Sequence, residues 1–130
     1  YKNSLVTFEE NDLTNSTVRY QIMLDVFDAH PKAKLGGATY QWVNRSCKQF
    51  DYIFNNINQI SIPIILFSGE DEQIVSSSAH NEFINMLTAM GATATGYLVE
   101  GANHELLIEK DSIRTAVLSK TLDFFKQNQK

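Results

Sequence analysis

The chain has 130 residues, of which 43% are hydrophobic and 20% charged, and this composition is typical of one globular domain. The formal net charge is −4 without a run of Lys and Arg, which excludes nucleic acid as an expected partner, and no apolar run approaches the ~20 residues of a membrane span. The single cysteine, Cys47, excludes an intrachain disulfide and a thiolate zinc site, and we expect it to be buried or half-buried as a small apolar side chain.

Two helices are predicted in the first half of the chain. Residues 1–15 carry little periodicity, whereas residues 15–31 place Val18, Ile22 and Val26 at helical spacing, with Asn15 or Ser16 as the cap and Pro31 as the stop. After a loop at residues 34–37, residues 38–57 predict a second amphipathic helix. Its shared apolar face consists of Tyr40, Val43, Cys47, Phe50 and Phe54.

The second half is predicted to alternate strands and helices. Residues 62–67 form a continuous apolar run, typical of a parallel strand covered on both faces, and residues 95–99 form a second strand. A helix within residues 76–90 is predicted between them, with a serine cap and with Gly91 at its end. A closing helix starts near residue 111, capped by Asp111 or Ser112, and its predicted inward residues are Ile113, Val117, Leu118, Leu122 and Phe125.

This order predicts an α/β fold in which the two strands are parallel neighbours joined by a helical crossover. Two parallel strands need cover on both faces and do not stand alone. The chain also opens at Tyr1 in mid-pattern and not at Met. We therefore expect the sheet to continue in residues outside this sequence, and the chain to be a piece of a larger protein.

The candidate chemistry lies in the two loops that follow the predicted strands. The first loop offers Glu70, Asp71 and Glu72, and the second offers His104. Ligands gather at the carboxyl ends of strands in open α/β sheets, and neighbouring strands lie ~4.8 Å apart, so an acid of one loop can reach the imidazole of the next. A carboxylate that accepts a hydrogen bond from one ring nitrogen leaves the other free to act as a general base.

Three segments carry a resemblance to a known family. SIPIILFSGEDEQIV, residues 61–75, resembles the penultimate strand and acid loop of α/β-hydrolases. LVEGANHELLIEKDSIRTAVLSKTLDFF, residues 98–125, resembles the histidine loop and last helix of the bacterial lysophospholipase and monoacylglycerol lipase branch. LGGATYQWVNRS, residues 35–46, is similar to the segment in which bacterial lysophospholipases return from the lid to the core.

The resemblance implies a Ser-His-Asp/Glu triad in which His104 is the general base and Glu72 the acid. A slip of one residue in the match would make Asp71 the acid instead. No Gly-x-Ser-x-Gly occurs in the sequence, and no oxyanion-hole loop is recognised. We therefore expect the C-terminal part of an α/β-hydrolase, with residues 1–37 a remnant of the helical lid and residues 38–130 the C-terminal part of the core, and we expect this chain alone to be inactive.

The remaining candidates have simpler interpretations beside the functional ones. Tyr40 and Trp42 either pack in the core or contact the substrate and lid. His80 is expected at the surface, and His30 at a helix end, where a cation suits the helix dipole. We predict neither a cofactor nor a metal site.

Three functional hypotheses follow. The favoured one is a serine ester hydrolase acting on lysophospholipid or monoacylglycerol, cytoplasmic and in peripheral contact with the inner face of a membrane. The second is a non-catalytic hydrolase-like binding module, and the third is an α/β-hydrolase with another small-ester substrate. The expected partners are the lipid substrate and the missing N-terminal half of the protein, and an exposed sheet edge favours self-association.

Overall fold

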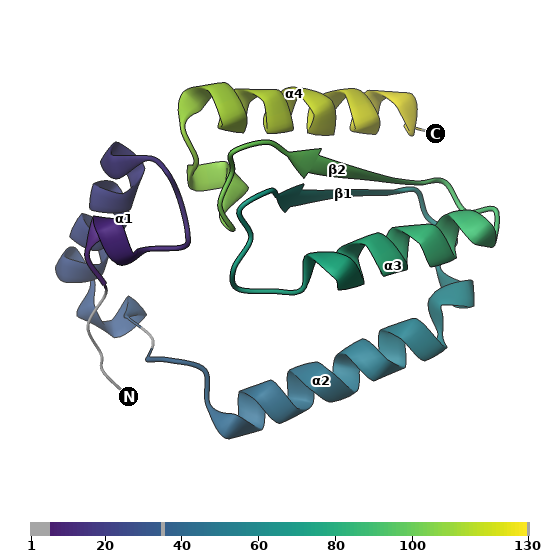
Figure 1. The fold of residues 1–130 in the computed structure, drawn as a ribbon, viewed down its shortest axis with the longest axis horizontal. Helices are drawn as coiled ribbons and strands as arrows, with labels where there is room; N and C mark the ends of the chain where they lie inside the picture. The colour runs from purple at the N-terminus through teal and green to yellow at the C-terminus, as the bar shows by residue number, and fades with distance from the viewer. Residues whose placement is uncertain (1–5, 35, 130) are drawn as a thin grey trace.

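A computed structural model describes residues 6–34 and 36–129 of the chain. Residues 1–5 of the predicted lid segment and Leu35 of the predicted 34–37 loop lie outside the described residues. Within the described ranges the α-helices are α1 (Thr17–Ala29), α2 (Tyr40–Asn55), α3 (Ser77–Ala89) and α4 (Asp111–Gln127), and the strands are β1 (Ile64–Gly69) and β2 (Ala94–Val99) (Figure 1).

The two strands form a parallel pair, which confirms the predicted α/β wiring. Their register runs from Ile64 opposite Ala94 to Gly69 opposite Val99, and α3 is the crossover between them. The strand β1 begins two residues later than the apolar run because Pro63 has no N–H to give to the ladder. The first backbone bond at this end therefore runs from the Ile64 N–H to the Thr93 carbonyl, at 2.8 Å.

The sheet lies between two helices, and a third helix lies outside them. Figure 1 shows α3 on one side of the strands and α4 on the other, with α2 beyond α3. The best-buried apolar side chains on these two inner helices are Leu87 of α3 and Val117 of α4. The helix α1 lies off the ends of the strand arrows, so the carboxyl ends of β1 and β2 face the first segment of the chain.

Local capping agrees with the sequence at two helices and differs at a third. Ser16 and Ser76 cap α1 and α3, each accepting the backbone N–H three residues on at 3.3 Å. Gly91 follows α3 with a φ of +78°, which only glycine adopts without strain. The prediction that Asp111 or Ser112 caps α4 is wrong, because Lys110 is the cap residue and its side chain makes no capping bond.

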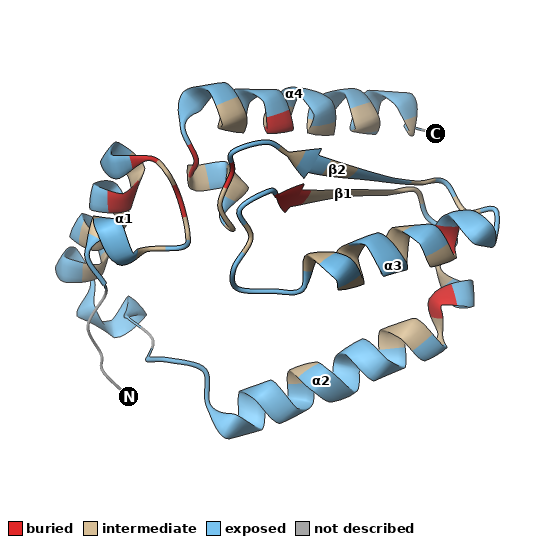
Figure 2. Cartoon of the chain, in the orientation of Figure 1, coloured by how far each residue is buried: buried red, intermediate tan, exposed pale blue. Residues whose placement is uncertain are grey.

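The predicted helix faces are much less buried than the pattern indicates (Figure 2). Cys47 is exposed, which corrects its expected burial, and Val43 and Phe50 on the same face of α2 are exposed too. Within the described residues, the C-terminal end of α2 contacts the crossover helix α3, and the rings of Phe54 on α2 and Phe83 on α3 lie 6.1 Å apart. The amphipathic pattern of α2 is real, but most of its apolar face meets no partner in the described chain.

A similar difference occurs on α4 at the other side of the sheet. Leu122 and Phe125, both predicted to point inward, are exposed, and the neighbouring Phe124 is half-buried instead. Phe124 lines a hollow together with Tyr97 of β2, and the Lys120 ammonium lies 4.4 Å from the centre of the Tyr97 ring. Near the C-terminal end of α4, the face that meets the sheet therefore includes Phe124 in place of the predicted Phe125.

Candidate active site

The carboxyl ends of β1 and β2 bring one acid and one histidine into contact. His104 Nδ1 lies 2.6 Å from Glu72 Oε2, which is the contact predicted from the order of the two loops. The Glu72 side chain is 3% exposed and the His104 side chain 27% exposed. An ionised carboxylate only accepts hydrogen bonds, so Nδ1 carries the proton and donates it, and Nε2 is left as the basic nitrogen.

The acid loop holds Glu72 by its own backbone. Glu72 Oε1 accepts the N–H of Ile74 at 2.7 Å and the N–H of Val75 at 3.1 Å, so the carboxylate is fixed on both oxygens. Burial raises the pKa of this carboxyl, but the hydrogen bonds from His104, Ile74 and Val75 lower it by more, and the net pKa lies below the ordinary value. Glu72 is therefore an anion at neutral pH, as an imidazole-orienting group must be.

Backbone contacts join the acid loop to the histidine loop. The Glu70 N–H donates to the Val99 carbonyl and the Asp71 N–H donates to the Ala102 carbonyl, both at 3.0 Å. In return the Gly101 N–H donates to Glu70 Oε2 at 2.9 Å. The Asp71 side chain is exposed, so the structure brings Glu72 and not Asp71 to the imidazole.

Gly69 makes this close approach possible. A Cβ at this position would lie 2.4 Å from the Ala102 carbonyl oxygen and 2.5 Å from the Asn103 carbonyl oxygen. Real Cβ atoms essentially never come that close to another atom, and neither oxygen belongs to a flexible side chain. The glycine that follows the predicted strand is thus required by packing against the histidine loop.

The first segment of the chain completes the site, although its sequence shows little periodicity. The His104 N–H donates to the Asp12 carbonyl at 3.3 Å, and the Glu105 N–H donates to the Leu13 carbonyl at 2.8 Å. Sequence reasoning missed this contact, and it also missed Asn15 and Glu109, which join the same two segments. A polar run without a pattern gives no periodic signal from which such a long-range contact is predicted.

The other candidate residues lie apart from the Glu72–His104 pair. Tyr40 and Trp42 start α2 and are 86% and 63% exposed, so the structure neither packs them in the core nor shows a contact with the pair. His30 ends α1 as predicted and is exposed.

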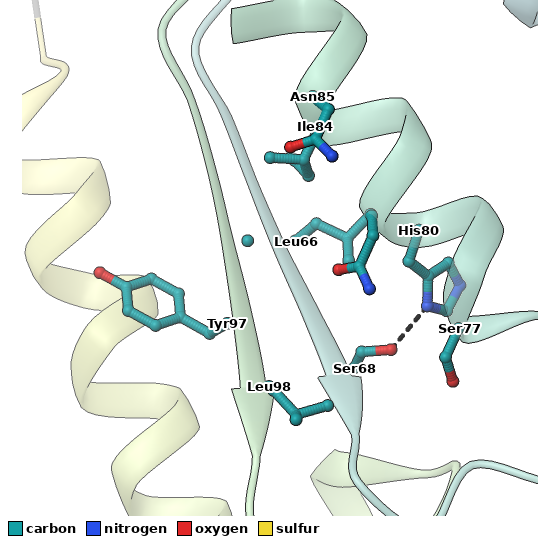
Figure 3. A pocket seen from close by; sticks show the side chains of 10 residues that line it. Leu66, Ser68, Ser77, His80, Ile84, Asn85, Tyr97 and Leu98 are labelled. Carbon is teal, nitrogen blue, oxygen red and sulfur yellow. Dashed lines mark hydrogen bonds between the residues drawn. The ribbon is translucent and has the colours of Figure 1, made fainter.

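His80 is not the surface residue that the sequence suggested. It is half-buried on α3, and its Nδ1 lies 2.6 Å from the Oγ of Ser68 on β1 (Figure 3). The two side chains line a hollow of about 490 Å³ between α3 and the sheet. Neither Glu72 nor His104 is among the residues that line this hollow. Ser68 is only 8% exposed, and a buried hydroxyl needs a hydrogen-bond partner. This need explains why His80 turns its imidazole inward from α3.

Neither a metal-binding cluster nor a membrane-spanning helix occurs in the described part of the chain. No group of three or more His, Cys, Asp or Glu side chains there could hold a metal ion. Over the same residues, every helix is too short or too polar to cross a membrane.

The arrangement can perform one half of a nucleophilic mechanism. A buried carboxylate that holds Nδ1 leaves Nε2 able to take a proton from a hydroxyl or a water, and it stabilises the imidazolium that forms. The nucleophile itself has no candidate in the sequence, because no Gly-x-Ser-x-Gly occurs and Ser76 caps α3. The site thus contains a carboxylate and an imidazole in the geometry of an acid–base pair.

Comparisons with known proteins place this geometry in context. Residues 2–111 match the family model described as serine aminopeptidase, S33. The chain is similar to lysophospholipase L2 of Escherichia coli strain K12, with 32% identity over 124 residues that cover 93% of this chain and 36% of the relative. It is also similar to the probable lysophospholipase L2 of Haemophilus influenzae, with 33% identity over 116 residues that cover 89% of this chain and 36% of the relative. The chain therefore spans about 36% of the length of these curated relatives.

Proposed function

The chain belongs to the serine aminopeptidase S33 family of α/β-hydrolases, and from this premise we propose that it supplies the acid and the base of a serine-hydrolase triad. In this proposal His104 is the general base and Glu72 is the acid that orients it. The observation that carries the proposal is the 2.6 Å contact between Glu72 Oε2 and His104 Nδ1 at the carboxyl ends of adjacent parallel strands. The order of acid before histidine along the chain is that of α/β-hydrolases.

The proposed substrates are the carboxylic esters of lysophospholipid or monoacylglycerol. Support comes from the similarity to proteins named lysophospholipase L2. In this proposal residues 1–37 belong to the lid, residues 38–130 belong to the core, and the exposed rings of Tyr40 and Trp42 contact the acyl chain or the lid. We further propose that the enzyme is cytoplasmic and meets its lipid substrate in peripheral contact with the inner face of a membrane.

The proposed reaction proceeds in two steps, with a serine from residues outside this chain as the nucleophile. The serine oxygen attacks the acyl carbonyl while its proton passes to His104 Nε2, and the imidazolium then gives that proton to the departing alcohol. In the second step Nε2 takes a proton from water, the hydroxide attacks the acyl-enzyme, and the proton returns to the serine as the fatty acid leaves. Glu72 remains ionised throughout and stabilises the imidazolium through its bond to Nδ1.

The test uses the complete polypeptide that contains this chain, assayed with a lysophospholipid and with a short-chain nitrophenyl ester. We expect His104→Ala to lower kcat by at least about 10³-fold, because no other group takes the proton. Glu72→Gln should lower kcat by about 10³- to 10⁴-fold, since the imidazole loses its orienting anion. Asp71→Asn is the matched control, one residue away and exposed, and should change kcat by less than about threefold.

The outcomes separate the competing hypotheses. A large loss with Asp71→Asn and a small one with Glu72→Gln would make Asp71 the acid. Turnover that survives His104→Ala would overturn the proposal. Binding of lysophospholipid without turnover of either ester would favour the non-catalytic module, and turnover of the nitrophenyl ester alone would favour a different small-ester substrate.

A further inference from the structure

A second carboxylate, Glu109, lies below the histidine loop and is completely buried. Its Oε1 accepts the backbone N–H of Asn103, the backbone N–H of Asn15 and the side-chain Nδ2–H of Asn15, each at 3.0 Å. Its Oε2 accepts the N–H of Lys110 at 2.9 Å. One side chain thus connects the first segment of the chain, the histidine loop and the start of α4.

The donors to this carboxylate are all uncharged N–H groups. Burying a carboxylate is costly unless its oxygens are hydrogen-bonded, and here four bonds satisfy them. Burial raises the pKa of Glu109, but the N–H groups of Asn103, Lys110 and Asn15 and the amide of Asn15 lower it by more, so the group remains an anion. The Arg19 guanidinium donates to the Glu109 backbone carbonyl at 2.8 Å and to Asp111, so its bonds go past the Glu109 carboxylate.

The contacts of Glu109 lead directly to the candidate base. Asn103 immediately precedes His104, so the bond to its N–H fixes the Ala102–Asn103 peptide, which is one residue before the imidazole. Asn15 reinforces the same turn, because its Nδ2 also donates to the Gly101 carbonyl at 3.1 Å and to Asn103 Oδ1 at 3.3 Å. The loop from residue 101 to residue 109 is therefore closed around one buried anion.

We propose that Glu109 is a positioning residue for His104, which holds the histidine loop against the segment of residues 12–15 so that the imidazole stays on Glu72. This inference rests on the proposed role of His104 as general base. Glu109 touches neither the reacting atoms nor the imidazole, so its effect is on the placement of Nε2. A displacement of a catalytic group by about 1 Å lowers a reaction rate by as much as about 10²-fold. Without the hydrogen bonds to Glu109, the loop that carries His104 is free to shift by such a distance.

The kinetic test compares three variants of the complete polypeptide. Glu109→Ala removes all four acceptor bonds, and we expect kcat to fall by about 10²-fold with KM changed by less than about twofold. Glu109→Gln keeps one acceptor oxygen for the Asn15 and Asn103 donors and should recover most of that loss. Glu105→Ala is the control, because this side chain is exposed on the same loop, and it should leave kcat within about twofold of the wild type.

A spectroscopic test reads the position of the imidazole without activity. With ¹⁵N-histidine labelling, the proton on His104 Nδ1 should give a downfield signal because it is donated to Glu72 at 2.6 Å. We expect this signal to weaken or shift in Glu109→Ala and in Asn15→Ala, and to persist in Glu109→Gln and Glu105→Ala. If Glu109→Ala does not fold, Asn15→Ala provides the decisive comparison, since it removes the amide donor alone.

The inference is overturned if the Nδ1 signal is the same in wild type, Glu109→Ala and Asn15→Ala, whatever happens to kcat. A fall in kcat with an unchanged signal would mean that Glu109 acts on something other than the imidazole. If wild type shows no turnover that depends on His104, the proposed function fails, but the Nδ1 signal still decides whether Glu109 positions the ring.

Discussion

At the scale of single residues, two buried carboxylates near the histidine loop have different hydrogen-bond partners. Glu72 receives one bond from an imidazole and two from backbone N–H groups, whereas Glu109 receives three bonds from backbone N–H groups and one from a side-chain amide. Both have a pKa below the ordinary value, because their hydrogen bonds outweigh burial, which alone raises the pKa. Both should therefore make the native state sensitive to acid.

We predict that Glu109→Gln flattens the acid side of the stability profile. A carboxyl whose native pKa is lowered stabilises the fold fully above its unfolded pKa of ~4.3, and this contribution is lost as pH falls through the native pKa, because the unfolded state binds the proton first. Urea unfolding of the complete polypeptide between about pH 6 and pH 3 measures the effect. Glu105→Gln serves as the exposed control, and equal acid slopes for wild type and Glu109→Gln would contradict the prediction.

At the scale of elements, the end of β1 and the histidine loop pack without room for a side chain. Gly69 is the last residue of β1, and the two carbonyl oxygens next to it belong to Ala102 and Asn103. Gly96 on β2 differs, because a Cβ there would meet the side chain of Ile84 at 3.3 Å. The two glycines therefore provide a matched pair on neighbouring strands.

Gly69→Ala should destabilise the complete polypeptide by about 1–3 kcal/mol, since the backbone must shift to admit the methyl group. Ester hydrolysis should also fall, because the shift moves the peptide next to His104. Gly96→Ala should have a smaller effect on both, since the Ile84 side chain can move by a few tenths of an ångström. Urea unfolding and steady-state kinetics check both variants, and a Gly69→Ala protein as stable as Gly96→Ala would show that the strand and loop are looser than described.

At the scale of the whole molecule, the described chain leaves many apolar side chains open to solvent. They occur on several elements, including Val18 of α1, Phe50 of α2, Leu98 of β2 and Phe125 of α4. The strands also form a sheet of only two members within the described residues. An exposed apolar surface of this kind marks an interaction site or drives association.

We predict that the 130-residue chain alone self-associates, binds a hydrophobic dye and shows no His104-dependent ester hydrolysis. An acid and a base without a nucleophile and oxyanion donors lack the covalent step and the main charge stabilisation. Adding the remaining part of the complete polypeptide should reduce dye binding and restore turnover. Sedimentation, dye fluorescence and a nitrophenyl ester assay test this, and a monodisperse chain that binds no dye would contradict it.

The local patterns of the sequence were sufficient for the helices, the strands and the contact between Glu72 and His104. The apolar run before Gly69 and the helical spacing within residues 76–90 depend on neighbouring residues along the chain. The contact between Glu72 and His104 was predicted because each lies in the loop that follows one of the two strands. Parallel pairing of β1 and β2 then follows from the handedness of the crossover, which leaves few alternatives. The resemblance of residues 61–75 to the acid loop of α/β-hydrolases favoured Glu72, with Asp71 as the alternative.

Only the tertiary structure decided which surfaces are covered and which polar groups meet. Asn15 and Glu109 are 94 residues apart and join through hydrogen bonds, which leave no periodic trace in a sequence. Asp111 accepts a hydrogen bond from the Arg19 guanidinium and does not cap α4. His80 turns its imidazole to the Ser68 hydroxyl. In both cases the polar group pairs with a partner that only the folded chain brings close to it. The exposure of Cys47 and Phe125 could not be predicted from the sequence either. An amphipathic pattern indicates which face of a helix needs a packing partner, but it does not show whether the chain provides one.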